Sequence, residues 1–307
     1  SSQMLELAGL DASFFPEWSE PGEVVGYVTD EAGKVCGLER GTPVVVGGHD
    51  TQFAILGAGA SLEDAILSSG TWEILGIRVG EFKPTRFGFR EGLIIEADVE
   101  AGLWNPQLLM IGSAVLEWIR ELFFPPADRD YVTMIREAEA IPPGSDGVIL
   151  IPSFVKDSGP TKKYGTLGTI LGLTLKTSRG HVYRAALEGL SYQLMEALRI
   201  LTRSTGFKAS GIRVVGGGSK NNLWNQLRAD ITGLPITIIS QREATVIGAA
   251  MTAFKGINIY KSLEEAMKNI KFEEQKFKPS RHRNLYKNLY KKYRTIPKTL
   301  RKFYQQT

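Results

Sequence analysis

The sequence predicts an α/β fold with a mixed β-sheet, and three observations lead to this prediction. Short apolar runs typical of strands alternate with longer segments of helical periodicity along most of the chain. Two apolar runs, residues 65–67 and 73–79, are separated by a glycine turn and indicate an antiparallel hairpin. The β-branched run at 42–46 ends in two glycines, which favours a strand buried on both faces.

The first 46 residues contain few apolar positions that could form a core. Residues 4–9 are typical of the end of a helix, residues 22–29 of an exposed strand, and residues 30–38 of a short polar helix. We therefore expect residues 1–46 to be the end of a domain whose bulk is outside this sequence.

From residue 41 onward the pattern of elements is richer. The helix expected at 177–205 has the clearest apolar stripe, and Gly206 ends it. The other helices are expected at 53–59, 109–124, 131–140, 220–232, 245–254 and 263–269, and the strands at 65–67, 73–79, 92–97, around 103, and at 147–154, 169–175, 212–215 and 235–239.

A polar cluster, His49-Asp50-Thr51-Gln52, follows the first of these strands. The ends of central strands are where α/β proteins place the groups that handle ligands. A carboxylate there suits a general base or an indirect contact to Mg²⁺. Asp50 is also a favoured residue for capping the helix that starts near Gln52, and from this cluster alone capping is the preferred interpretation.

Two glycine-containing turns are candidate phosphate or nucleotide sites. The hairpin turn Ser68–Thr71 offers hydroxyls and free backbone N–H groups, although most Ser-Gly turns are only turns. The turn Gly216–Ser219 lies between a strand and a helix, where free N–H groups and the helix dipole attract anions. Ser219 is the expected cap of that helix. Neither turn matches a standard nucleotide-binding fingerprint.

Composition excludes several classes of protein. The chain has 307 residues, no apolar run long enough to span a bilayer, and one cysteine, Cys36, so a disulfide within the chain is impossible. The single cysteine fits a cytoplasmic location. Of the net charge of +4, residues 276–302 supply eleven Lys and Arg and no acidic residue, which leaves about −7 on the rest. Tyrosines and leucines recur there at helical spacing, so we expect an amphipathic helix packed on the body and no nucleic-acid contact.

In combination, these features resemble the C-terminal half of the FGGY family of carbohydrate kinases. The matching segments are GTPVVVGGHDTQFAILGAGA (41–60), AILSSGTWEILGIRV (65–79), RGHVYRAALEGLSYQL (179–194) and VVGGGSKNNLWNQLRADITGLPI (214–236). The resemblance implies an actin-like ATPase (ribonuclease H-like) fold. It divides the chain into the end of an N-terminal sugar-binding domain (1–46), an ATP-binding domain (47–275) and a basic helical tail (276–307).

The resemblance also assigns roles to residues. Asp50 matches the catalytic base of the family and is expected to reach Mg²⁺, if at all, through a water, so no direct metal ligand is expected. The neighbours His49, Thr51 and Gln52 are expected to bind the sugar. The expected ATP-binding residues are Ser69, Gly70, Thr71, Gly112, Ser113, Glu117, Gly217, Gly218 and Asn221; Glu117 stands where related kinases often have Gln.

The function that follows is transfer of the γ-phosphoryl group of ATP to a ketose hydroxyl, with Mg²⁺ offsetting the phosphate charge. The HDT and SSGTW segments narrow the resemblance to the branch of the family that acts on L-fuculose or L-rhamnulose. Within that branch, Gln52 and Phe53 in the segment DTQFA favour L-fuculose; L-rhamnulose or another sugar of this family is the alternative. A non-catalytic actin-like module that binds nucleotide is the alternative from another class. Expected partners are the sugar, ATP and the rest of the N-terminal domain, with a homodimer left open and no nucleic acid or membrane.

Overall fold

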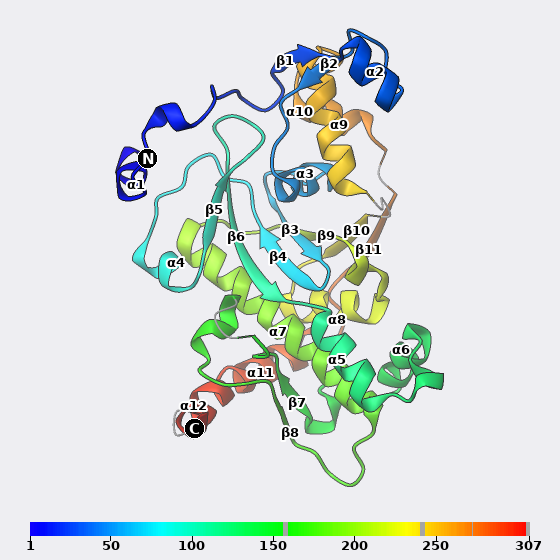
Figure 1. Ribbon diagram of the computed structural model, residues 1–307. Helices are drawn as coiled ribbons and strands as arrows, with labels where there is room; N and C mark the ends of the chain where they lie inside the picture. Colours follow the sequence, from blue (N-terminus) through cyan, green and yellow to red (C-terminus); the bar gives the residue numbers. More distant parts are fainter. Residues whose placement is uncertain (156–158, 240–242, 272, 305–307) are drawn as a thin grey trace.

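A seven-stranded mixed sheet forms the centre of the computed structural model (Figure 1), which describes all residues except 156–158, 240–242, 272 and 305–307. The three central neighbours β10, β9 and β3 are parallel, and the remaining pairs are antiparallel. The α/β fold with a mixed sheet is therefore confirmed. Across the sheet the order is β11 (Glu274–Phe277), β10 (Ile236–Ile239), β9 (Gly211–Val215), β3 (Asp64–Ser69), β4 (Trp72–Gly76), β6 (Trp104–Ile111) and β5 (Ile94–Ala97).

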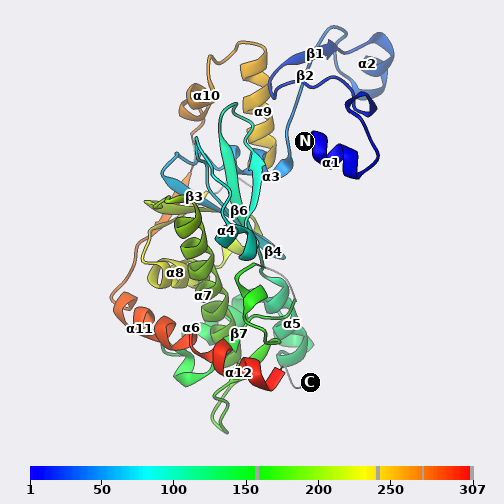
Figure 2. The ribbon, with the colours of Figure 1, turned by 90° about the vertical axis from the view of Figure 1, so that its left-hand side faces the viewer.

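Helices cover both faces of the sheet, and the alternation of side chains along β3 explains why. Ala65 and Leu67 point to one face, where they are buried with α7 (Arg179–Thr205) and α8 (Asn222–Thr232). Ile66 points to the other face, against α3 (Asp50–Gly57) and α9 (Ala244–Gly256). Figure 2 shows α7 and α8 on one side of the strands and α3 and α9 toward the other.

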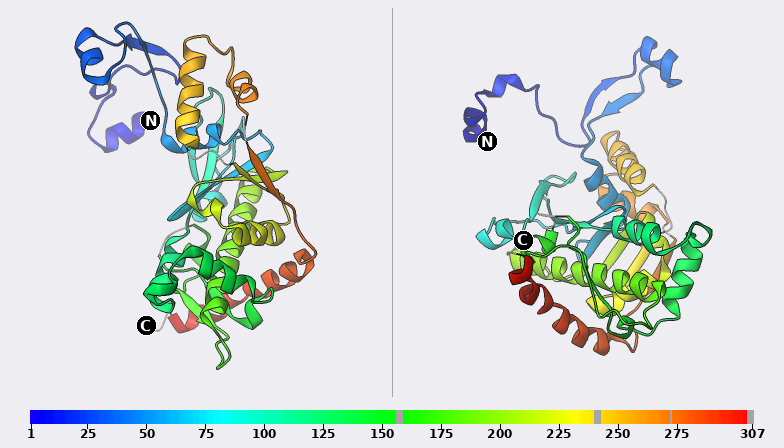
Figure 3. Two further views of the ribbon diagram at one scale, coloured as in Figure 1. Left: turned by 90° about the vertical axis from the view of Figure 1, so that its right-hand side faces the viewer. Right: turned by 60° about the horizontal axis from the view of Figure 1, so that its bottom comes forward.

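Beyond the sheet, α7 continues into a second core. There it packs with α5 (Ala114–Phe123), α6 (Tyr131–Glu139), the C-terminal helix α11 (Arg283–Tyr293), and a separate hairpin of β7 (Ile149–Ile151) and β8 (Thr169–Leu171). The basic tail folds as α11 and α12 (Ile296–Tyr304), which run along the edge of the body in Figure 3. Tyr286, Tyr290 and Tyr293 are buried, which confirms that the tail packs on the body.

The N-terminal segment lies outside both cores. It contains α1 (Ser2–Leu7), a two-stranded sheet of β1 (Val24–Tyr27) and β2 (Pro43–Val45), and α2 (Asp30–Cys36). In Figure 1, β1, β2 and α2 lie at the top near α9 and α10 (Leu263–Asn269), whereas α1 lies apart at the left. The expectation that the 42–46 strand is buried on both faces was wrong: β2 pairs with β1 alone among the described residues, and Val44 is exposed. A β-branched run reports strand propensity, but burial depends on what covers the strand.

Two further expectations were wrong in detail. Residues 109–111 belong to the end of β6, and the helix begins only at Ala114, because Leu108 and Met110 fill the core beneath the sheet. The cap of α8 is Asn221, whose side chain accepts from the N–H of Trp224 (3.0 Å). Ser219 instead lies in a short 3₁₀ turn, where its hydroxyl donates to the carbonyl of Gly216 (2.7 Å).

Strand β11 and the short helix α4 (Arg86–Arg90) were not anticipated, and the helix expected in the basic tail is divided into α11 and α12. In the described part of the chain, no helix combines the length and apolar character needed to cross a membrane.

Candidate functional site

A cavity of about 500 Å³ lies where the glycine turns predicted from the sequence meet. Six of the expected ATP-binding residues line it, and they come from two turns and two helix starts: Gly70, Thr71, Ser113, Gly217, Gly218 and Asn221. Its other walls are Leu116 of α5, Tyr131 and Ile135 of α6, Tyr183 of α7, and Lys220 and Trp224 at and beyond the glycine turn. The cavity therefore combines backbone turns on one side with apolar and aromatic surface on the other.

The two glycine turns touch each other so closely that side chains are excluded. A Cβ atom on Gly218 would lie 2.1 Å from the hydroxyl of Ser69, and one on Gly216 would lie 2.6 Å from the Ser69 carbonyl oxygen. Gly217 differs, because a Cβ there would meet no atom within 4 Å. Gly216 and Gly218 therefore serve packing, and Gly217 faces open space at the cavity.

The hairpin turn is tied to the start of α5. The N–H of Ser113 donates to the carbonyl of Gly70 (2.9 Å), and the N–H of Gly112 donates to that of Thr71 (3.0 Å). A Cβ on Gly112 would lie 2.6 Å from the Gly70 oxygen, so Gly112 supports the turn from behind. We expected free backbone N–H groups in this turn, but the N–H of Gly70 donates to the carbonyl of Trp72 (2.9 Å) and is not free. The hydroxyl of Thr71 has no hydrogen bond to a described residue.

A buried charged network holds the hairpin turn from below. The guanidinium of Arg228 donates to the carboxylate of Glu73 and to the hydroxyl of Ser69 (2.7 Å), and Ser69 also donates to Glu73 (2.8 Å). Arg228 further donates to Asn225 (3.0 Å), whose amide donates to the carbonyl of Ser219 (2.7 Å). The network thus connects both glycine turns, and Ser69 is part of it instead of the cavity wall.

The buried ion pair of Arg228 and Glu73 was not predicted from the sequence. Both side chains are almost fully buried, at 0% and 1% exposed. The only sequence signal was an acidic residue inside an apolar strand and a basic residue on the inner face of an apolar helix, and charged residues are rarely buried unless they are paired.

Glu117 lies beside the cavity without lining it. Its carboxylate accepts from the hydroxyl of Tyr131 and forms an ion pair with Arg120 (2.7 Å). Glu117 therefore positions Tyr131, which does line the cavity.

The cluster predicted to handle the sugar does not line this cavity. His49 lies 3.4 Å from the carboxylate of Asp50 and 3.7 Å from that of Glu96 on β5, which also accepts from the buried amide of Gln52. Glu96 was not anticipated, because it is far from the cluster in sequence. Thr51 donates to Asp50 (3.4 Å), and both side chains reach solvent.

The capping role left open for Asp50 is not observed. The residue in the cap position of α3 is His49, and no cap hydrogen bond is formed by a side chain there. Asp50 is the first helical residue, and its carboxylate is 77% exposed. It is therefore available to a ligand.

A resident metal site built from protein ligands alone is not present among the described residues, since no three His, Cys, Asp or Glu side chains converge. Mg²⁺ in phosphoryl-transfer sites is held mainly by phosphates and waters, with one or two carboxylates. The exposed carboxylate of Asp50 fits this second kind of site.

Comparison with known proteins identifies matches along most of the chain. Residues 65–257 match the C-terminal domain of the FGGY family of carbohydrate kinases, and residues 1–57 match its N-terminal domain. L-fuculokinase of Escherichia coli K12 is 40% identical over 91% of this chain and 57% of its own length. Autoinducer-2 kinase of Yersinia enterocolitica is 29% identical over 92% of this chain and 55% of its own. The chain thus spans about half the length of these curated relatives.

Solved structures confirm the expected actin-like ATPase fold. Xylulose kinase from Rhodospirillum rubrum superposes with a TM-score of 0.86 at 23% identity, covering 99% of this chain and 61% of that chain. Ligand-bound xylulose kinase from Lactobacillus acidophilus gives 0.89 at 21% identity, with 100% and 61% coverage.

Proposed function

Because the chain belongs to the FGGY family of carbohydrate kinases, we propose that it supplies the ATP-binding half of a kinase that phosphorylates a ketose hydroxyl. The reaction is in-line transfer of the γ-phosphoryl group, which depends mainly on positioning and electrostatic stabilisation. The observation that carries this proposal is the cavity bounded by the two glycine turns and the starts of α5 and α8.

Within this proposal the cavity binds ATP in a defined direction. The rings of Tyr131, Tyr183 and Trp224 provide apolar surface for the adenosine, and the bare backbone at Gly217 leaves room for it. The hairpin turn with Thr71 and the N-terminus of α5 suit the phosphates, because turn amides and helix N-termini attract anions. Lys220 adds a cation at the mouth.

Asp50 is proposed as the general base. A sugar hydroxyl is too weakly acidic to ionise at neutral pH, so its proton must leave as the phosphoryl group arrives. The exposed carboxylate can accept that proton, and through a water it can contact Mg²⁺ on the ATP phosphates. His49, Thr51 and Gln52 are proposed to contact the sugar, and Glu96 positions His49 and Gln52.

We propose L-fuculose as the sugar, supported by the 40% identity to L-fuculokinase, with L-rhamnulose or another sugar of the family as the alternative. Residues 1–46 are proposed to be the end of the sugar-binding domain. In support, their apolar side chains are widely exposed, for example Trp18 at 86% and Phe14 at 68%. A covering domain of the longer relatives would bury such a surface.

The test uses Asp50→Asn in a polypeptide that joins this chain to a complete N-terminal domain of the family. Asn keeps the shape of Asp but cannot accept the proton, so kcat with L-fuculose should fall by about 10²–10⁴, the range for general acid–base catalysis. The affinity for ATP should change much less, because Asp50 lies outside the cavity.

The control is Asp30→Asn, an exposed carboxylate on α2 that pairs with Arg40 at the surface. It should leave kcat unchanged, and both variants should melt at the temperature of the parent. A loss below about threefold for Asp50→Asn would remove Asp50 as the base, since general-base catalysis is worth far more. Binding of ATP without sugar-dependent turnover in the joined parent polypeptide would instead favour the non-catalytic module.

A further inference from the structure

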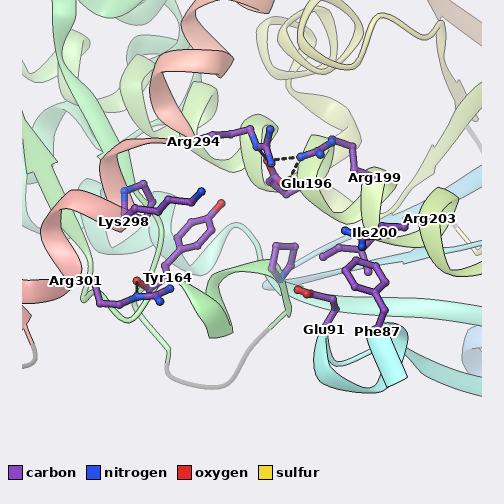
Figure 4. Close-up of a pocket in the computed structure, with 12 residues that line it drawn as sticks. Phe87, Glu91, Tyr164, Glu196, Arg199, Ile200, Arg203, Arg294, Lys298 and Arg301 are labelled. Atoms are coloured by element: carbon purple, nitrogen blue, oxygen red, sulfur yellow. Dashed lines mark hydrogen bonds and ion pairs between the residues drawn. The ribbon is translucent and has the colours of Figure 1, made fainter. Parts of the chain in front are cut away.

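A second cavity, separate from the one described above, lies between α7, α12 and α4 (Figure 4). Its volume is about 290 Å³, near the lower end of the roughly 300–1,000 Å³ typical of small-molecule sites. Tyr183 and Glu196 are both on α7 and line different cavities, which places the two sites roughly 20 Å apart at about 1.5 Å of rise per residue.

Basic side chains dominate the walls of this second cavity. Five of the described lining residues are basic and two are acidic: Arg199, Arg203, Arg294, Lys298 and Arg301 against Glu91 and Glu196. They converge from helices that are distant in sequence, as Figure 4 shows. The described lining therefore has an excess of positive charge at a concave surface, which raises the local concentration of anions.

The acidic side chain at the centre is already committed to its neighbours. Glu196 forms ion pairs with Arg199 (3.0 Å) and Arg294 (2.6 Å) and accepts from the hydroxyl of Tyr290. One carboxylate shared by two guanidinium groups leaves donors on both arginines for a further acceptor, since each guanidinium carries five N–H groups. Glu196 therefore holds Arg199 and Arg294 in place, but its single negative charge does not neutralise both guanidinium groups.

Two other cations lack a carboxylate partner within the described residues. Arg203 stacks its guanidinium 4.1 Å from the centre of the Phe87 ring, which fixes the group while leaving its edge N–H donors available. Lys298 is exposed on α12 and forms no ion pair there. The cavity is also lined by apolar and aromatic side chains, those of Ile200, Pro160, Pro297 and Tyr164.

We propose that this cavity is a binding site for a phosphorylated small molecule, distinct from the ATP cavity. Arginine forks match the geometry of phosphate oxygens, and the mixed apolar floor suits the body of a phosphate ester. Since α7 lines both cavities, an anion bound here contacts the helix that also carries Tyr183. The site does not depend on the proposed kinase function.

The test is a calorimetric titration of the 307-residue chain with inorganic pyrophosphate, without Mg²⁺ and at constant ionic strength set with chloride. The double variant Arg203→Gln/Lys298→Gln removes one cation from each side of the cavity. The matched control, Lys208→Gln/Lys302→Gln, removes the same charge from exposed residues near the same helices that do not line the cavity. Thr71→Glu, which places a carboxylate on the phosphate side of the ATP cavity, reports binding there.

We expect saturable binding to the parent chain, to the control and to Thr71→Glu. The double variant should bind at least about tenfold more weakly, because charge-assisted hydrogen bonds to phosphate are lost. Equal weakening by the control would show general charge attraction and overturn the proposal. Loss of binding in Thr71→Glu, or no saturable binding to the parent chain, would overturn it as well.

Discussion

Replacing Glu73 by Gln tests the buried network beneath the hairpin turn. Gln keeps the shape of the side chain but removes the charge opposite Arg228, which is fully buried and cannot move to water. Burial already lowers the pKa of the Arg228 guanidinium, while the carboxylate of Glu73 opposes that shift. In the variant, the guanidinium would keep its stacking on the ring of Trp224 and neutral acceptors on Ser69, Asn225 and the new amide, but no carboxylate.

The expected loss in the free energy of unfolding is about 3–5 kcal/mol, the cost of leaving a buried charge without its partner. The matched control is Glu274→Gln, which breaks the ion pair with Arg213 at a position where Glu274 is 26% exposed. Its loss should be about 1 kcal/mol or less, because partly solvated pairs contribute little. Removing both charges in Glu73→Leu/Arg228→Met should cost less than Glu73→Gln alone.

Urea unfolding followed by circular dichroism measures all of these variants, and comparable slopes show that the unfolded states are alike. A loss below about 1 kcal/mol for Glu73→Gln would mean that the guanidinium is solvated or paired in another way. In that case the charged network would not be what holds the two glycine turns together.

Three further predictions concern the whole chain and its tail. The 307-residue chain alone should show no sugar-dependent ATP turnover in a coupled assay, because such chemistry needs a cleft closed by two domains; turnover above the background without sugar would contradict this. Tyr286→Ala should cost about 3–5 kcal/mol in urea unfolding, since Tyr286 is buried and bonded to Arg184 and Glu188, whereas the exposed Tyr27→Ala should cost little. Random duplex DNA should not bind at physiological ionic strength in a mobility-shift assay; salt-sensitive binding that disappears when residues 276–302 are deleted would refute the packing role of the tail.

The sheet and the long helix were predictable because their signals are local. The continuous apolar run at 65–67 is typical of a strand, and the apolar stripe of residues 179–205 specifies one face of a helix. The structure buries both, with the run at 65–67 covered on the two faces of the sheet. The strand structure of residues 109–111 was not predictable in this way. An apolar run that directly precedes a helix fits either a strand or the first turn of that helix until its neighbours in the fold are known. The same reason explains β2, whose burial depends on residues far along the chain.

The part of the site that consists of backbone turns was predictable from the sequence. Glycine at 217 and 218, the hairpin turn and the start of α5 converge because turns at the ends of neighbouring strands meet. The aromatic wall, Arg228 with Glu73, and Glu96 were not predictable, since each comes from a distant element and none forms a local pattern. The proposed role of Asp50 as a base came from the resemblance to a family, because the local sequence alone favoured a helix cap.

The central claim is that the cavity between the glycine turns binds ATP, and calorimetric titration of the 307-residue chain with ATP tests it most directly. Gly217→Val places a branched side chain where no protein atom lies within 4 Å, so the fold should persist while the cavity is filled. The control is Gly80→Val, another glycine with open space around its Cβ but outside the cavity. We predict saturable binding of ATP to the parent chain and to Gly80→Val. The affinity of Gly217→Val for ATP should be at least about tenfold lower, which corresponds to roughly 1.4 kcal/mol of binding free energy. Unchanged affinity in Gly217→Val, with circular dichroism showing an intact fold, would contradict it.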